Sequence, residues 1–198
     1  RVIRAAEAAR DGKFQVDVIA LRRGKQPPIE TIRGVRVFRV QSRYRGRSLL
    51  RYSMGYGKFF VRCVVLSMQL FRTMRYRLVH VHNMPDALVF AACFLKLCGA
   101  KVILDIHDPM PETYASKFHH FTNRMLHKML LLQERLSIAF ADKTITVSDP
   151  VRDGILLKRR YRHKTIDVIA NFADGELFTP IIYPPLDGVI RFVFHGTI

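Results

Sequence analysis

The chain has 198 residues, of which 49% are apolar, and its 33 Lys and Arg residues against 16 Asp and Glu residues give a formal net charge of +17. This length suffices for one substantial core and the start of a second domain. The positive charge indicates a polyanionic partner, which could be nucleic acid, an anionic membrane surface or a phosphorylated substrate. The chain has three cysteines without a C-x-x-C spacing, which argues against a disulfide scaffold and a zinc site. It also has no membrane-spanning apolar run and no secretory signal, so we expect a cytoplasmic protein.

Hydrophobic periodicity predicts helices and strands that alternate along the chain. In chain order we expect a helix over 1–11, strands over 14–20 and 35–38, a basic loop over 41–52, a helix over 57–75, a strand over 78–82, a helix from Pro85 to Gly99, a strand over 101–106, a helix over 121–141, a strand over 144–148, a helix over 151–161 and strands over 166–170 and 189–194. Short apolar strands in this alternation favour an α/β fold with a doubly wound, Rossmann-like parallel sheet.

Polar side chains follow four of the predicted strands, at the edge where doubly wound sheets bind ligands. They are His80, His82, Asn83 and Asp86; Asp105, His107 and Asp108; Ser148 and Asp149; and Asn171 and Asp174. Several have a structural explanation when taken singly. His80 alternates with Val79 and Val81, as a core histidine would. Ser148 is equally well explained as a helix cap, and Asp86 fits the first turn of a helix.

The densest group lies in the stretch 103–112, ILDIHDPMPE, where a buried strand leads into a histidine flanked by carboxylates. His107 could be a structural histidine bonded to a neighbouring carboxylate. Asp105 and His107 could also be two metal ligands of a metallophosphoesterase, but that chemistry needs further ligand motifs, such as G-D-x-x-D or G-N-H-E, which the sequence lacks. Sugar recognition is the third interpretation, since His, Asp and Asn offer short donors and acceptors for hydroxyl groups.

The order of these segments resembles the amino-terminal half of family 4 glycosyltransferases of the GT-B fold. The resemblance covers nearly the whole chain and is based on four motifs in sequence: VHVHN before a helix, a strand ending in HD, VS after ADKTIT, and N-x-x-D-x-x-x-F-x-P before a linker. It implies two Rossmann-like domains that face each other across a cleft. It also implies transfer of a sugar from a nucleotide-sugar with retention of the anomeric configuration, without a metal ion or a further cofactor.

The resemblance also implies roles for individual residues. His107 matches the family histidine that contacts the transferring sugar or its leaving phosphate, so it is the expected catalytic residue. The other expected substrate-binding residues are Asn83, Asp86, Asp108 and Glu112 on the acceptor side, with Ser148 and Asn171. The acceptor is expected to be a saccharide or a lipid-linked sugar, as in the synthesis of a surface polysaccharide or a glycolipid.

The same resemblance divides the chain into segments. Residues 1–179 are expected to form the acceptor-side domain, 180–188 an interdomain linker, and 189–198 the first strand of a nucleotide-sugar-binding domain. Because the sequence starts within the family's first helix and stops at that strand, we expect a fold truncated at both ends and a fragment that is inactive alone.

The positive charge allows two further interpretations. A nucleic-acid-binding module is disfavoured because the basic residues are scattered and no aromatic–basic recognition signature is present, so no nucleic acid partner is expected. The other is peripheral docking on the inner face of the cell membrane, through cations that meet anionic lipid and aromatic side chains that enter the headgroup layer, either by the transferase or by a binding module without catalysis. Equally, the aromatic residues could pack the core while the arginines only confer solubility. The cations are Arg43, Arg45, Arg47, Arg51, Lys58, Arg62, Arg72, Arg75 and Arg77, and the aromatic residues are Tyr44, Tyr52, Tyr56, Phe59 and Phe60.

Overall fold

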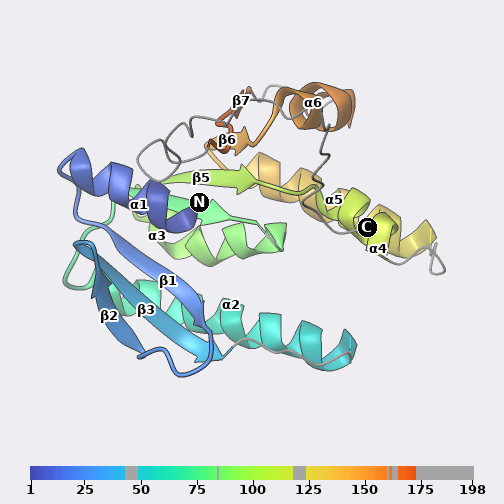
Figure 1. Cartoon of the computed structure of the whole chain (residues 1–198). Helices are drawn as coiled ribbons and strands as arrows, with labels where there is room; N and C mark the ends of the chain where they lie inside the picture. The colour runs from blue at the N-terminus through green and yellow to red at the C-terminus, as the bar shows by residue number, and fades with distance from the viewer. Residues whose placement is uncertain (43–48, 84, 118–123, 160, 162–164, 173–198) are drawn as a thin grey trace, which may run out of the picture.

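The computed structural model describes residues 1–42, 49–83, 85–117, 124–159, 161 and 165–172, shown in colour in Figure 1. Over these residues helices and strands follow one another in the predicted order, apart from one additional strand and one additional helix. The expected linker at 180–188 and the expected strand at 189–194 lie outside the described residues. No helix in the described part of the chain is long and apolar enough to span a bilayer.

Three strands of the amino-terminal part form one sheet in the order β1-β3-β2. Strand β1 (Asp17–Arg22) pairs in parallel with β3 (Val35–Ser42), and β2 (Ile29–Ile32) pairs antiparallel with β3. The sequence did not predict β2. It forms a hairpin with β3 through Arg33 and Gly34, which have φ values of 48° and 80°, the positive φ at both central positions that a tight hairpin turn requires.

Helices cover both faces of this sheet, and the alternation of β1 shows how. Helix α1 (Val2–Asp11) packs against Val18 and Ala20, whereas helix α2 (Leu49–Phe71) packs against Ile19 and Leu21. Successive side chains of a strand point to opposite faces, so β1 is apolar on both sides. The doubly wound arrangement predicted from the sequence is therefore confirmed for these strands.

A second sheet of four parallel strands has the order β4-β5-β6-β7. Its strands are β4 (Leu78–His82), β5 (Lys101–Ile106), β6 (Lys143–Thr146) and β7 (Ile166–Val168). Val102, Leu104 and Ile106 of β5 are wholly inaccessible and form the centre of the largest core cluster. Because these three side chains share one face of β5, the intervening residues, Ile103 and Asp105, must face the other way.

The helices of the second half follow the strands that the sequence placed. Their bounds are η1, a 3₁₀ helix (Asp86–Ala92); α3 (Cys93–Leu97); α4 (Met110–Lys117); α5 (Arg124–Phe140); and α6 (Asp149–Val151), continued by η2 (Arg152–Leu156) and η3 (Leu157–Arg159). Figure 1 shows α2 beside β3 of the first sheet and α5 beside the second sheet. Gly99 follows α3 with a φ of 95°, which explains why the chain turns there into β5.

Two helices differ from the sequence prediction. Helix α2 begins at Leu49 rather than near residue 57, although it then contains Gly55 and Gly57, which each weaken a helix by up to about 1 kcal/mol relative to alanine. Packing of the later turns on β1 and β3 outweighs this cost. Helix α4 was not predicted, because Pro109 and Pro111 indicated a turn; Pro111 instead occupies the first turn of the helix, where a missing N–H costs nothing.

A buried charge network joins α4, α5 and η3. Glu134 of α5 is wholly inaccessible, and its carboxylate accepts hydrogen bonds from the Arg159 guanidinium and the Tyr161 hydroxyl. Arg159 also forms an ion pair with Glu112 of α4. Since a carboxylate is buried only with compensating partners, Arg159 holds these elements together.

We expect Arg159→Ala to lower the free energy of unfolding by about 3–5 kcal/mol, because it leaves the buried Glu134 carboxylate without its cation. The matched control is Arg152→Ala, since Arg152 pairs with Asp149 and Asp153 at the surface, where ion pairs contribute little. Urea unfolding followed by circular dichroism measures both. Equal small losses for the two variants would contradict a compensating role for Arg159.

Candidate functional site

Four side chains meet at the carboxyl end of β4 and β5 and are called the histidine cluster here: His80, His82, Asp105 and His107. Residues 80 and 82 alternate with Val79 and Val81, which face the core, so both histidines lie on the opposite face of β4. The strand register places His82 directly beside Asp105 of β5. The cluster therefore forms because alternate side chains of a strand lie on the same face of the sheet and because β4 and β5 pair with each other.

One carboxylate oxygen is the centre of this cluster. Asp105 is almost wholly buried, and its Oδ2 lies 3.1 Å from His82 Nδ1, 3.2 Å from His107 Nε2 and 3.4 Å from His80 Nε2. The rings also contact one another. His80 and His82 stack with centroids 4.2 Å apart, and His82 Nδ1 lies 3.1 Å from His107 Nε2.

Arg1, immediately before α1, completes the surroundings of Asp105. Its guanidinium donates to both carboxylate oxygens, with Nε 2.9 Å from Oδ2 and a terminal nitrogen 3.0 Å from Oδ1. The other terminal nitrogen donates to the carbonyl of Ile169 and to Oδ1 of Asn171, both at 2.8 Å. One arginine thus ties the start of α1 to β5 and to the segment after β7.

Burial and hydrogen bonding shift the pKa values of Asp105 and His82 in opposite directions. Burial alone would raise the pKa of Asp105, but its contacts with His107, His80, His82 and Arg1 outweigh this effect and hold that pKa well below its usual range. Burial lowers the pKa of His82, an effect that the neighbouring carboxylate opposes. Asp105 is therefore ionised, and its charge is balanced by Arg1.

The cluster also has the donor set of a cation site. His80, His82 and Asp105 each offer one ligand atom, and these atoms lie within 4.8 Å of one another. His80 Nε2 is buried and has no well-aligned hydrogen bond within the described residues, and Asp105 Oδ2 lies 3.4 Å from it. A cation bound here would share Asp105 with the Arg1 guanidinium, and the two positive charges would repel each other.

Asn83 connects the segments that follow β4 and β5. Its amide nitrogen donates to Asp86 Oδ1 at 2.9 Å and to the carbonyl of Asp108 at 2.7 Å, while its amide oxygen accepts from the backbone N–H of His107 at 2.9 Å. Asp86 itself is wholly inaccessible. These two residues therefore fix the backbone at His107, and Asp86 is positioned to support Asn83 rather than to meet a ligand.

The other expected substrate-binding residues have different surroundings. Ser148 caps α6, with Oγ accepting from the Val151 N–H at 3.4 Å, which matches the capping alternative. Asn171 accepts from Arg1, and Glu112 pairs with Arg159. Asp108 is exposed and follows His107 directly. Among the expected site residues Asp108 and Asn171 are exposed, Asp86 is inaccessible, and the others are half-buried, namely Asn83, His107, Glu112 and Ser148.

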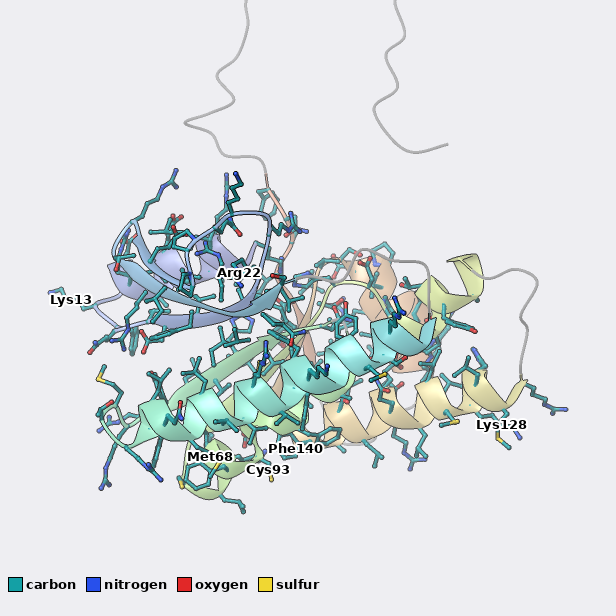
Figure 2. The ribbon with its side chains drawn as sticks, turned by 90° about the horizontal axis from the view of Figure 1, so that it is seen from below. Lys13, Arg22, Met68, Cys93, Lys128 and Phe140 are labelled. Carbon is teal, nitrogen blue, oxygen red and sulfur yellow. The ribbon has the colours of Figure 1, made fainter. Side chains whose placement is uncertain are left out.

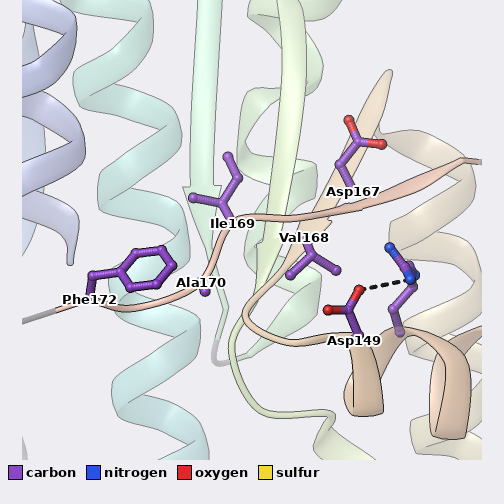
Figure 3. Close-up of a pocket in the computed structure, with 7 residues that line it drawn as sticks. Asp149, Asp167, Val168, Ile169, Ala170 and Phe172 are labelled. Atoms are coloured by element: carbon purple, nitrogen blue, oxygen red, sulfur yellow. Dashed lines mark ion pairs between the residues drawn. The ribbon is translucent and has the colours of Figure 1, made fainter.

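A hollow lies between β7 and α6, and Figure 3 shows the side chains that line it. Asp149 and Arg152 form an ion pair of 2.8 Å on one side, and the exposed ring of Phe172 lies on the other. The lining also includes Ile169, whose carbonyl accepts from Arg1. Arg1 therefore contacts both a residue that lines the hollow and Asp105 of the cluster.

The sequence analysis predicted no role for Arg1, and it considered Asp105 as a metal ligand but did not include it among the expected substrate-binding residues. The alternation of His80 and His82 in VHVHN was a signal that both lie on one face, and the parallel strand order was a signal that Asp105 lies beside them. No signal in the sequence pointed to Arg1, which contacts a residue more than a hundred positions away.

Comparison with known proteins identifies the family of the chain and solved structures with a similar fold. Residues 1–177 match the model of the family described as Glycosyltransferase Family 4. Among solved structures, the chain is similar to a sucrose-phosphate synthase from Thermosynechococcus elongatus, with a TM-score of 0.57 and 16% sequence identity over 87% of this chain and 84% of that chain. At this identity the likeness shows a shared fold alone. No curated protein matches the chain.

The buried Asp86 carboxyl gives a pH-dependent stability. Burial raises its pKa from 3.8 to about 6, so the folded state binds this proton more tightly than the unfolded state. The wild-type chain should therefore lose stability relative to Asp86→Asn as the pH rises from about 4 to about 6, by at most about 3 kcal/mol. Urea unfolding of both proteins across this range measures the difference. A difference that stays constant with pH would contradict the buried, protonated carboxyl.

Proposed function

The chain belongs to glycosyltransferase family 4, and from this premise we propose that it serves the transfer of a hexosyl group from a nucleotide-sugar to a saccharide or lipid-linked acceptor, with retention of the anomeric configuration. The observation that supports this proposal most directly is the position of His107. The family match spans residues 1–177, and within it His107 directly follows β5 at the carboxyl edge of the parallel sheet, against a buried carboxylate.

We assign His107 the role of stabilising the negative charge that develops on the departing diphosphate, or of donating to a hydroxyl of the transferring sugar. Its Nε2 faces Asp105 and His82, so Nδ1 is the ring nitrogen that can contact a ligand. Arg1 and Asp105 cancel each other's charge. The buried carboxylate therefore adds no net negative charge that would repel an anionic leaving group.

The acceptor side is proposed to begin at Asp108, whose exposed carboxylate can accept hydrogen bonds from sugar hydroxyls. The side chains of Asn83, Asp86, Glu112, Ser148 and Asn171 make the protein contacts described above, so their contribution to binding is proposed to be the shape of the strand edge. The site is proposed to work without a metal ion or a cofactor other than the donor, because Arg1 already supplies the charge that balances Asp105.

The domain division is proposed on the family resemblance. Residues 1–179 form the acceptor-side domain, 180–188 the linker, and 189–198 the start of a domain that binds the nucleotide-sugar. Transfer is therefore assayed with the protein expressed from its full coding sequence.

A lipid-linked acceptor suits a cytoplasmic protein that docks on an anionic membrane surface, in the synthesis of a polysaccharide or glycolipid. The structure changes the surface that the sequence suggested for docking. Arg43, Arg45, Arg47 and Tyr44 lie outside the described residues. Phe59 is buried in the core, and Phe60 packs beside it, so these two rings do not face a bilayer. The cations Arg51, Lys58 and Arg62 are exposed along α2, as expected.

We expect His107→Ala to lower kcat by about two orders of magnitude or more, the scale for loss of one charge-stabilising donor. Transfer of labelled sugar from a panel of nucleotide-sugars to membrane extract measures the effect. The matched control is His127→Ala, because His127 is an exposed histidine on α5, outside the cluster. Wild-type turnover in a correctly folded His107→Ala protein would show that His107 is structural.

A further inference from the structure

Helix α5 carries a row of large apolar side chains on its outer side. Its inner side is formed by Leu130, Glu134, Ser137 and Ile138, which are buried. On the outer side Met125, Met129, Leu132 and Leu136 are exposed by 68%, 60%, 56% and 50% of their surface. Their spacing of four, three and four residues places them along one line of the helix. Four such side chains in a row are more than the scattered apolar residues of an ordinary surface.

The charges beside this row are all positive. Arg124, Lys128 and Arg135 are exposed on α5, and no exposed position of this helix carries an acid, because its one carboxylate, Glu134, is buried. An exposed apolar line flanked by cations is the pattern of helices that lie in the headgroup layer of a bilayer, where the apolar side chains enter the lipid and the cations meet phosphate.

Helix α2 repeats the pattern. Met54, Val61, Val65 and Met68 are exposed, together with Arg51, Lys58 and Arg62, and α2 contains no Asp or Glu residue. Both helices pack against η1. Figure 2 shows the two helices from the same side, with Met68 labelled near α2 and Lys128 near the start of α5. The segment between Glu30 and Asp86 also contains no acidic residue, so the charge of this part of the chain is uniformly positive.

We propose that the outer side of α5, together with that of α2, docks on an anionic phospholipid surface. The apolar line of α5 enters the headgroup layer, and Arg124, Lys128 and Arg135 contact lipid phosphates. The inference rests on the proposed function and extends it, because a lipid-linked acceptor would be bound at this surface. Vesicle binding is measured without any sugar transfer, so the docking proposal and the proposed function can each fail while the other holds.

Two other occupants fit the surface less well. A second copy of the chain would bring the same acid-free, basic helix against this one, and like charges across an interface oppose association. Nucleic acid would meet the cations, but its phosphate backbone would leave four large apolar side chains without a partner. An anionic bilayer satisfies both the charge and the apolar line.

The test is sedimentation of the chain with phosphatidylcholine vesicles, with and without phosphatidylglycerol. We expect binding to the anionic vesicles only, and loss of that binding in high salt. The variant M129Q/L132Q should bind at least about tenfold more weakly, because it removes apolar side chains from the α5 line. The control F14Q/I29Q removes two exposed apolar side chains away from α5 and should bind like the wild type. Circular dichroism checks that both variants fold.

Several results would overturn the proposal. They are no binding to anionic vesicles, equal binding to neutral vesicles, and unchanged binding of M129Q/L132Q. Dimers of the chain that M129Q/L132Q abolishes, without any binding to vesicles, would assign the surface to a second copy instead. Sugar transfer that fails while vesicle binding holds would count against the proposed function and leave the docking surface in place.

Discussion

A carboxylate buried at the end of a strand has to be compensated, since an uncompensated charge in the interior costs several kcal/mol. In this protein that carboxylate is Asp105, and the compensation comes from distant segments. Arg1 binds both of its oxygens, and His82 and His107 approach one of them from β4 and from the end of β5. Through its remaining donors Arg1 also holds the segment after β7. One charge thus fixes how four segments meet at the strand edge.

The same arrangement determines the chemistry that the edge can perform. Because Arg1 and Asp105 neutralise each other, this pair leaves no net negative charge at the edge that would repel an anionic ligand. Asn83 fixes the backbone of His107 from the neighbouring segment, so the ring is held at the edge by two independent sets of contacts. A fixed donor in a partly dry site stabilises developing negative charge better than a mobile one, because it needs no reorganisation when the charge forms.

The sequence predicts the parts of this architecture that depend on local periodicity. The apolar alternation located most strands, and the polar residues after β4 and β5 indicated the sheet edge at which the candidate site lies. Long-range contacts could not be predicted, as Arg1 shows, because nothing near it in the sequence indicates a carboxylate partner. Strand β2 was missed because it has four residues and depends on the Arg33-Gly34 turn. The aromatic residues of α2 were expected at a membrane, but the face on which Phe59 lies is decided by packing against β1 and β3.

The central claim is that the Asp105 carboxylate assembles the histidine cluster, and an NMR titration of the His82 ring in the wild type and in Asp105→Asn tests it most directly. The two side chains have the same shape, so the substitution removes the charge and little else. Because an adjacent carboxylate favours protonated imidazole, the account predicts a lower pKa for His82 in the variant than in the wild type. An unchanged or higher pKa of His82 in a folded Asp105→Asn protein would contradict the claim.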